Sequence, residues 1–181
     1  FDIEKMKRVW CIIVLLTNLL VVNTYAQTID STNIDSLLQA KFDAHYLKTF
    51  TLEDSVFEVG SVLVEDVVFY DGRLHQKGIR QLSLIFEFLK QNESLHVLIV
   101  NHTGVRGKEA YNNAVSKRRA EGVMYYLASK GISESRLKYS GKGESDLIIS
   151  QEETLTLPTK LLQEKAHALN RRTEFKIISI D

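Results

Sequence analysis

Residues 102–120 read "HTGVRGKEAYNNAVSKRRA", and this stretch decides the fold prediction. A helical pattern begins inside it, runs from about Lys108 to Lys130 and stops at Gly131, a residue type that commonly ends helices. The sequence therefore predicts a long helix that follows a short loop beginning at His102.

The inner face of this predicted helix mixes polar and apolar side chains. Asn112, Ser116 and Arg119 follow one another at intervals of four and three residues, so they lie on one side of a helix. Val115 and Val123 belong to the same side. A fully solvent-exposed helix face would rarely carry these valines, and a purely hydrophobic core would rarely contain an arginine. The pattern indicates a partly buried binding site.

Strand and helix patterns alternate on the N-terminal side of this helix. Residues 61–70, "SVLVEDVVFY", are rich in β-branched residues and predict one or two strands. Residues 79–92 predict an amphipathic helix. Its apolar positions are Ile79, Leu82, Ile85, Phe86 and Leu89. Residues 95–100, "LHVLIV", predict an interior strand that ends at Asn101.

On the C-terminal side, residues 136–145, "RLKYSGKGES", predict a strand with glycines where the backbone bends or is approached closely. An excursion follows that contains Pro158 and a predicted short helix in 160–169. Residues 171–180, "RRTEFKIISI", predict a last strand with one exposed face. The whole order, βαβαβ-β, predicts an α/β (α+β) sandwich, in which two main helices pack on one face of a mixed sheet.

Residues 1–26 have the pattern of a secretory signal peptide. "KMKR" precedes the 14-residue, mostly apolar run "VWCIIVLLTNLLVV", and Ala26 lies at a suitable cleavage position. The run is shorter than the ~20 apolar residues of a membrane span and is interrupted by Thr17 and Asn18. We therefore expect no transmembrane span in the mature chain. A true start at Met6 remains an open alternative.

The remaining chain divides into a predicted N-terminal arm, residues 27–59, and a single domain, residues 60–181. Within the arm, "DSLLQAKF" predicts a short helix capped by Asp35 or Ser36. Without residues 1–26 the formal net charge is minus one. The composition therefore gives no excess of positive charge that would predict nucleic-acid binding. The only cysteine, Cys11, belongs to the signal region, which leaves the mature chain without disulfides or thiolate chemistry.

The common catalytic, metal and cofactor motifs are missing from the sequence. It contains no G-x-S-x-G elbow, no phosphate-binding G-x-x-x-x-G-K-[ST] loop and no H-E-x-x-H pair. None of the five histidines has metal-ligand spacing from another histidine. We expect no catalytic residue, no metal and no cofactor.

Noncovalent binding has better support, because Arg119 offers a fork of donors that suits a carboxylate. Asn112, on the same side of the helix, can both donate and accept. An equally good alternative at this stage is a network that locks the fold, with Arg119 paired to an internal acid. Arg171 and Arg172, before the last strand, carry the same ambiguity.

Three motifs in fixed order resemble the OmpA-like C-terminal domain family. They are "HTG..G..AYN..VS.RRA..V..YL", "GI....L...GKGES" and "LNRRTEFKI", and the similarity extends from about Gly60 to Ile178. The segments "FEVGSVLVEDVVFYD" and "EKAHALNRRTEF" look most like envelope proteins of the Bacteroidetes type.

The resemblance implies a noncatalytic peptidoglycan-binding domain of a Gram-negative cell envelope. Such a domain would be periplasmic, associated with the outer membrane or cell wall, and would hold the stem peptide by its diaminopimelate. The family arginine that takes the carboxylate falls on Arg119, and the family asparagine falls on Asn112. Thr103 and Arg172 are expected as lesser contacts, with turn chemistry and strand-edge solvation as their alternative roles.

One position departs from the family pattern. An aspartate normally follows the loop threonine and supplies the other half of the site, whereas here Thr103 is followed by Gly104. A lost charge-assisted hydrogen bond is worth roughly 1.5 to 3 kcal/mol, so weak binding is expected. The alternative is an envelope scaffold that binds other proteins and has lost wall binding.

Overall fold

The computed structural model describes residues 31–46, 48–70 and 73–181. The predicted signal peptide, the possible start at Met6 and the first residues of the arm lie outside this part. The chain divides into two units, residues 1–37 and 38–181, and the site described below belongs entirely to the second unit.

A four-stranded mixed sheet forms the centre of the second unit, as the sequence predicts. Its strands are β1 (Val62–Glu65), β4 (Leu95–His102), β5 (Leu137–Gly143) and β6 (Thr173–Ile180), in the spatial order β1-β6-β4-β5. β4 and β5 run parallel, whereas β6 is antiparallel to both β4 and β1. The strands β2 (Phe69–Tyr70) and β3 (Arg73–Leu74) form a separate antiparallel pair.

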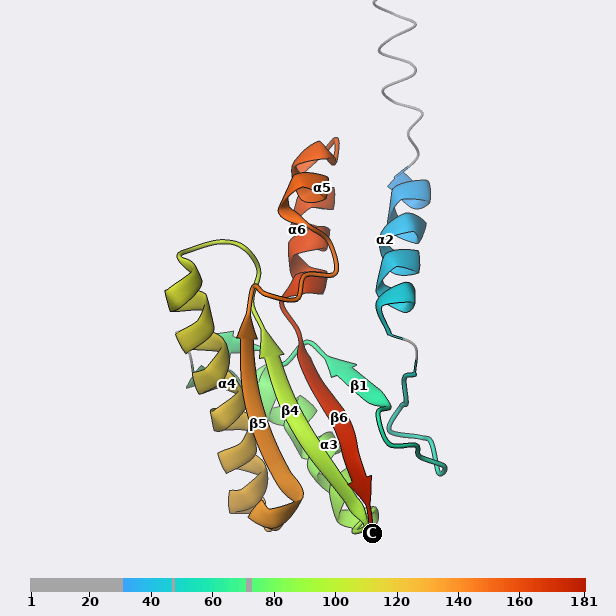
Figure 1. Cartoon of the computed structure of the whole chain (residues 1–181), viewed down its shortest axis with the longest axis vertical. Coiled ribbons are helices and arrows are strands. Elements are labelled where there is room, and N and C mark those ends of the chain that lie inside the picture. The colour runs from blue at the N-terminus through green and yellow to red at the C-terminus, as the bar shows by residue number, and fades with distance from the viewer. Residues whose placement is uncertain (1–30, 47, 71–72) are drawn as a thin grey trace, which may run out of the picture. The chain divides into compact units, whose positions relative to one another are not determined.

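The two main helices, α3 (Gln76–Gln91) and α4 (Glu109–Lys130), pack on one face of this sheet, as expected (Figure 1). Alternate residues of the central strands supply the sheet side of the core, because successive strand side chains point to opposite faces. They are Leu95, Val97 and Ile99 of β4 and Phe175 and Ile177 of β6, all nearly or fully buried.

Three further helices and a 3-10 turn complete the described elements. The helix α2 spans Ser31–His45, α5 spans Gln151–Thr156 and α6 spans Lys160–Asn170, while a 3-10 turn covers Glu134–Arg136. The pair α5 and α6 forms the predicted excursion between β5 and β6 (Figure 1). Among the described residues, the longest apolar stretch in any helix falls short of what crossing a membrane would require.

The start and end of α4 follow the sequence prediction closely. It ends at Gly131, whose φ of 114° is a left-handed conformation that glycine adopts without a steric penalty. A second glycine, Gly141 in β5, brings the helix and sheet together. A Cβ on Gly141 would lie 2.1 Å from the backbone N of Lys117 and 2.6 Å from Ser116 Oγ. Only a residue without a side chain permits this approach.

The inner face of α3 differs in part from the prediction. Leu82, Ile85 and Leu89 are buried as expected, but Ile79 is 39% exposed. Gly78 is buried in its place, since a Cβ there would lie only 2.5 Å from the carbonyl oxygen of Val68. Backbone contact at Gly78 therefore sets which side of the helix faces inward.

Two further expectations need correction. The helix α2 begins at Ser31, so Asp35 and Ser36 lie inside it rather than at its N-cap position. On β6, strand alternation predicts Glu174 on the exposed face, yet it is only 8% exposed. Contacts with Arg172 and Tyr46 cover it.

Candidate functional site

A small cleft lies where β4 passes into the loop before α4. Its cavity volume is about 160 Å³, and we call it the arginine cleft. The described residues that line it are Thr103, Gly104, Arg106, Tyr111, Asn112, Val115, Arg119, His167 and Arg171. These residues come from the loop, from the first half of α4 and from the end of α6. Segments that are far apart in sequence therefore line the same cleft.

Arg119 occupies the inner end of this cleft without a protein acid beside it. Its guanidinium carbon lies 5.1 Å from the centroid of the Phe69 ring. Its Nε is buried and makes no hydrogen bond, and no carboxylate of the described residues forms an ion pair with it. Burial lowers the pKa of Arg119 from its ordinary value, and the nearby charges of Arg118 and Arg171 act in the same direction. The side chain is still a cation at neutral pH.

Two more buried polar atoms face the cleft unpartnered. These are Thr103 Oγ1 and His167 Nδ1, on side chains that are 7% and 9% exposed. Buried polar atoms nearly always have a hydrogen-bond partner in proteins, so three orphans around one cavity indicate a place for ligand atoms or ordered water. Burial, aided by the charges of Arg106 and Arg171, lowers the pKa of His167 despite the opposing charge of Glu164. Its ring is therefore neutral near pH 7.

A second hollow of about 270 Å³ shares Arg119 and Arg171 with the arginine cleft. Asn101 and His102, at the end of β4, also line it, and each has a buried atom without a hydrogen bond. Asp66 contributes the only carboxylate among its described lining residues. Arg119 thus borders both cavities.

Residues 69–156 match the model of the OmpA family. These residues are an OmpA family domain. The matched residues run from Phe69, which stacks on Arg119, to the end of α5, and they include the loop and the helix that build the arginine cleft.

Curated relatives of this OmpA family domain are envelope proteins by name. The chain is 37% identical over 82 residues to outer membrane protein A of Bordetella avium, which covers 45% of this chain and 37% of that protein. It is 30% identical over 106 residues to the peptidoglycan-associated lipoprotein of Legionella pneumophila, covering 58% of this chain and 54% of that protein. The chain thus spans only about a third to a half of these two relatives.

Solved structures share the fold at lower identity. The periplasmic domain of Helicobacter pylori MotB (residues 78-256) superposes with a TM-score of 0.53 at 19% identity, covering 70% of this chain and 80% of that one. The cell wall anchor of the T6SS from Pseudomonas aeruginosa gives 0.52 at 19% identity, over 65% and 80% of the two chains. These likenesses support the OmpA-like fold.

The predicted contact Asn112 lies in the cleft of the OmpA family domain, but its amide is largely engaged by the protein. Its Nδ2 donates to the carbonyl oxygen of Gly104 at 3.3 Å and to Glu144 Oε2 at 2.5 Å. These bonds join the loop and the segment after β5 to α4. No described residue donates a hydrogen bond to its Oδ1. The third polar residue of the same helix face, Ser116, accepts a hydrogen bond from Gly143 N at 2.8 Å and holds β5.

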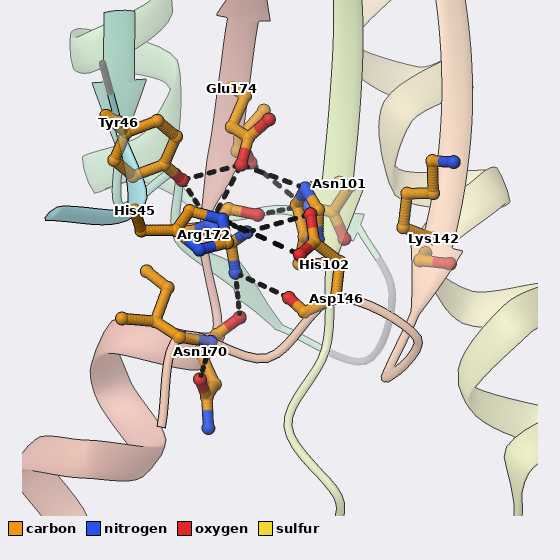
Figure 2. A network of polar contacts seen from close by, with 12 residues as sticks. His45, Tyr46, Asn101, His102, Lys142, Asp146, Asn170, Arg172 and Glu174 are labelled. Carbon is orange, nitrogen blue, oxygen red and sulfur yellow. Dashed lines mark hydrogen bonds and ion pairs between the residues drawn. The ribbon is translucent and has the colours of Figure 1, made fainter. Parts of the chain in front are cut away.

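Arg172 does not line the arginine cleft but borders the second hollow, and its side chain belongs to an internal network (Figure 2). Its Nε donates to Glu174 Oε1 at 2.9 Å and to the hydroxyl of Tyr46, and its Nη1 donates to the carbonyl oxygen of Asp146 at 3.1 Å. Tyr46 in turn donates to Glu174 at 2.6 Å. These contacts support the structural alternative for Arg172, and a ligand role for it stays a prediction.

The same network contains His45, Asp146 and Glu174, whose ligand atoms lie within 4.8 Å of one another. Such a cluster resembles a metal site, but Arg172 donates to Glu174 and its Nη2 lies 3.3 Å from His45 Nε2 and 3.5 Å from Asp146 Oδ2. A guanidinium therefore fills the position that a cation would take. His102 Nε2 also lies 3.1 Å from Glu174 Oε1, at ion-pair distance but not aligned for a hydrogen bond.

Sequence reasoning did not single out His167 in the arginine cleft or Phe69 beside Arg119, and it left Arg171 open between a binding and a structural role. Strand alternation does place Arg171 and Arg172 on opposite sides of the chain. It does not say which side faces the cleft, and that depends on the packing of α6 and β6. His167 carries no motif of its own and reaches the cleft only because α6 ends beside the loop.

Proposed function

We propose that this domain binds peptidoglycan without catalysing a reaction, with Arg119 holding the side-chain carboxylate of a diaminopimelate in the stem peptide. The observation that carries the proposal is a half-buried guanidinium that stacks on Phe69 and has no acid partner among the described residues. Keeping such a charge partly desolvated is unfavourable unless an anion joins it. A carboxylate accepts two parallel hydrogen bonds from an arginine fork.

The surroundings suit this ligand. Thr103 Oγ1 and His167 Nδ1 face the same cavity and can each bond a polar ligand atom. The volume of about 160 Å³ admits the end of a side chain rather than a whole sugar or peptide. One relative bears the name peptidoglycan-associated lipoprotein. We propose accordingly that the protein is exported by its N-terminal signal and works in the periplasm, at the wall or outer membrane of a Gram-negative, Bacteroidetes-type cell.

Sedimentation with purified sacculi tests this function. Wild-type protein is expected in the pellet, Arg119→Ala mostly in the supernatant, and Arg118→Ala in the pellet. Arg118 is the matched control because it is the neighbouring cation on the exposed side of α4. Thermal melts of each variant establish that it is folded. Wild-type protein that stays in the supernatant would refute wall binding, and equal sedimentation of all three proteins would refute the role of Arg119.

Weak affinity is part of the proposal, since Gly104 supplies no acid to a ligand ammonium. The missing interaction corresponds to roughly 1.5 to 3 kcal/mol, or about one to two orders of magnitude in the dissociation constant.

The second candidate function is a scaffold for other envelope proteins. Leu155 of α5 and Leu161 of α6 are each 68% exposed, and such apolar side chains can contribute to a protein interface. Under this alternative, sacculi fail to sediment the protein, and substitution of these leucines rather than of Arg119 weakens its associations.

A further inference from the structure

The charges that line the arginine cleft are all of one sign. Arg106, Arg119 and Arg171 line it, and its described lining residues include no aspartate or glutamate. Arg171 forms no ion pair or side-chain hydrogen bond with any described residue, although its charge acts on Glu164 from a longer distance, so two guanidinium groups face the cavity without a directly bound carboxylate. A ligand entering the cleft thus meets uncompensated positive charge.

The acids that contact lining residues of the cleft are already engaged. Glu144 accepts a hydrogen bond from Asn112 Nδ2 at 2.5 Å. Glu164 of α6 binds Arg106 through both of its carboxylate oxygens, and this pairing lowers the pKa of Glu164. The bidentate pair is well satisfied and leaves little capacity for a ligand ammonium. It is also exposed, on side chains 59% and 51% accessible, at the rim rather than inside the cavity.

Gly104 marks the position from which an acid could reach the cavity. A Cβ on Gly104 would lie 3.9 Å from Arg171 Cγ and 3.9 Å from His167 Nδ1, both ordinary contact distances. Its φ does not fall in the left-handed region, unlike that of Gly107 in the same loop. The backbone therefore admits a side chain at 104, directed toward two lining residues of the cleft. Neither steric hindrance nor backbone strain requires glycine here.

The charges around the cleft determine which charged groups a ligand can place there. An unmodified diaminopimelate side chain carries a carboxylate and, on the same carbon, an ammonium. Arg119 attracts the carboxylate, but the ammonium would sit near Arg119 and Arg171 with no described lining acid to neutralise it. In a cross-linked stem peptide this amine is acylated and uncharged, while the carboxylate is retained. An amide can also accept or donate a hydrogen bond to Thr103 or His167.

We infer that the arginine cleft prefers a diaminopimelate carboxylate whose neighbouring amine is acylated, as in cross-linked peptidoglycan, over the same carboxylate beside a free ammonium. The inference rests on the proposed function and specifies its ligand. Like charges separated by a few ångströms near a protein surface change affinity by on the order of tenfold.

Three synthetic stem tripeptides test the preference by titration calorimetry with the full chain. One has the free side-chain amine, one has it acetylated, and one has the side-chain carboxylate amidated. Wild-type protein is expected to bind the acetylated peptide on the order of tenfold more tightly than the free amine. The amidated peptide is expected to lose binding, because Arg119 no longer meets a carboxylate.

Gly104→Asp is the decisive variant, and Gly104→Asn is its uncharged match of the same size. We expect Gly104→Asp to reverse the preference toward the free amine and Gly104→Asn to retain the wild-type order. Equal binding of the acetylated and free peptides, a wild-type preference for the free amine, or reversal by asparagine as well would overturn the inference while leaving wall binding intact. If the protein binds neither sacculi nor any of the three peptides, both the proposed function and the inference are refuted.

Discussion

Arg119 and Phe69 form a cation–π pair, with 5.1 Å between the guanidinium carbon and the ring centroid. The guanidinium carbon lies over the ring, and a cation–π contact uses none of the N–H donors of the arginine. Phe69 thus restricts the motion of the arginine without competing for its hydrogen bonds. A side chain held in this way loses less conformational entropy when a carboxylate arrives.

Arg119→Met separates a binding role from a structural one. Methionine can maintain contact with Phe69 and removes a desolvated cation that has no acid partner among the described residues. We expect the free energy of unfolding to stay unchanged or to rise by up to about 1 kcal/mol, as measured by urea denaturation. A loss clearly larger than about 1 kcal/mol would contradict this, and would favour the fold-locking network that the sequence left open.

Unlike the substitution of Arg119, the substitution of Arg172 is expected to lower the free energy of unfolding. Arg172→Met would leave Glu174 buried without its cation and should cost about 3 to 5 kcal/mol in urea denaturation. Adding Glu174→Gln to this variant should recover part of the loss, because the uncompensated charge is removed. Arg171→Met is the matched control and should shift stability by less than about 0.5 kcal/mol. Similar losses for the two arginine variants would show that the network does not depend on Arg172.

The network also predicts an acid-sensitive fold. Burial favours the neutral form of Glu174, but His102, the hydroxyl of Tyr46 and the charge of Arg172 outweigh it and lower the pKa of Glu174 to about 2. A carboxyl whose pKa is depressed on folding stabilises the protein above its unfolded pKa, ordinarily 4.5, and this contribution is lost as the pH falls toward 2. The contribution amounts to about 3 kcal/mol.

Urea denaturation at a series of pH values from 6 to 2 checks this dependence. Glu174→Gln should flatten the decline between about pH 5 and pH 2 relative to wild type. Glu153 also has a pKa lowered to about 2, chiefly by its hydrogen bond from Lys41. Its side chain is 45% exposed, so screening by solvent makes its share smaller. Parallel curves for wild type and Glu174→Gln would contradict the assignment.

Two glycines near the same helix should respond oppositely to alanine. A Cβ at Gly141 would collide with the backbone of Lys117, and neither element can yield without disturbing the sheet. We expect Gly141→Ala to lose at least about 3 kcal/mol in urea denaturation. Gly122 lies within α4, where an added Cβ would meet no atom within 4 Å, and Gly122→Ala should gain about 0.5 to 1 kcal/mol. A tolerated alanine at 141 would argue against the tight contact of α4 with β5.

The order of elements could be predicted from the sequence because hydrophobic periodicity and helix-ending residues are local signals. Gly131 marked the end of α4, and the alternating pattern of residues 171–180 marked β6. The rotation of α3 could not be predicted, since it depends on the distant contact between Gly78 and the backbone of Val68. The burial of Glu174 also could not be predicted, since it depends on contacts with Tyr46 and His102, which are distant in sequence.

The site was predicted in part. The spacing of Asn112, Ser116 and Arg119 indicated a shared polar face, and all three lie on the inner side of α4. Spacing alone did not show that Ser116 and most of the Asn112 amide serve the protein itself, leaving Arg119 as the unpaired group. Such a distinction depends on partners such as Gly143 and Glu144, which only the folded chain brings within reach.

Arg171 in the cleft and Arg172 in the internal network are consecutive residues, and Tyr46 of the N-terminal segment is tied to the second of them. The two guanidinium groups of this dipeptide therefore have different surroundings, one open to solvent and ligand and the other enclosed by the protein's own carboxylate and hydroxyl groups.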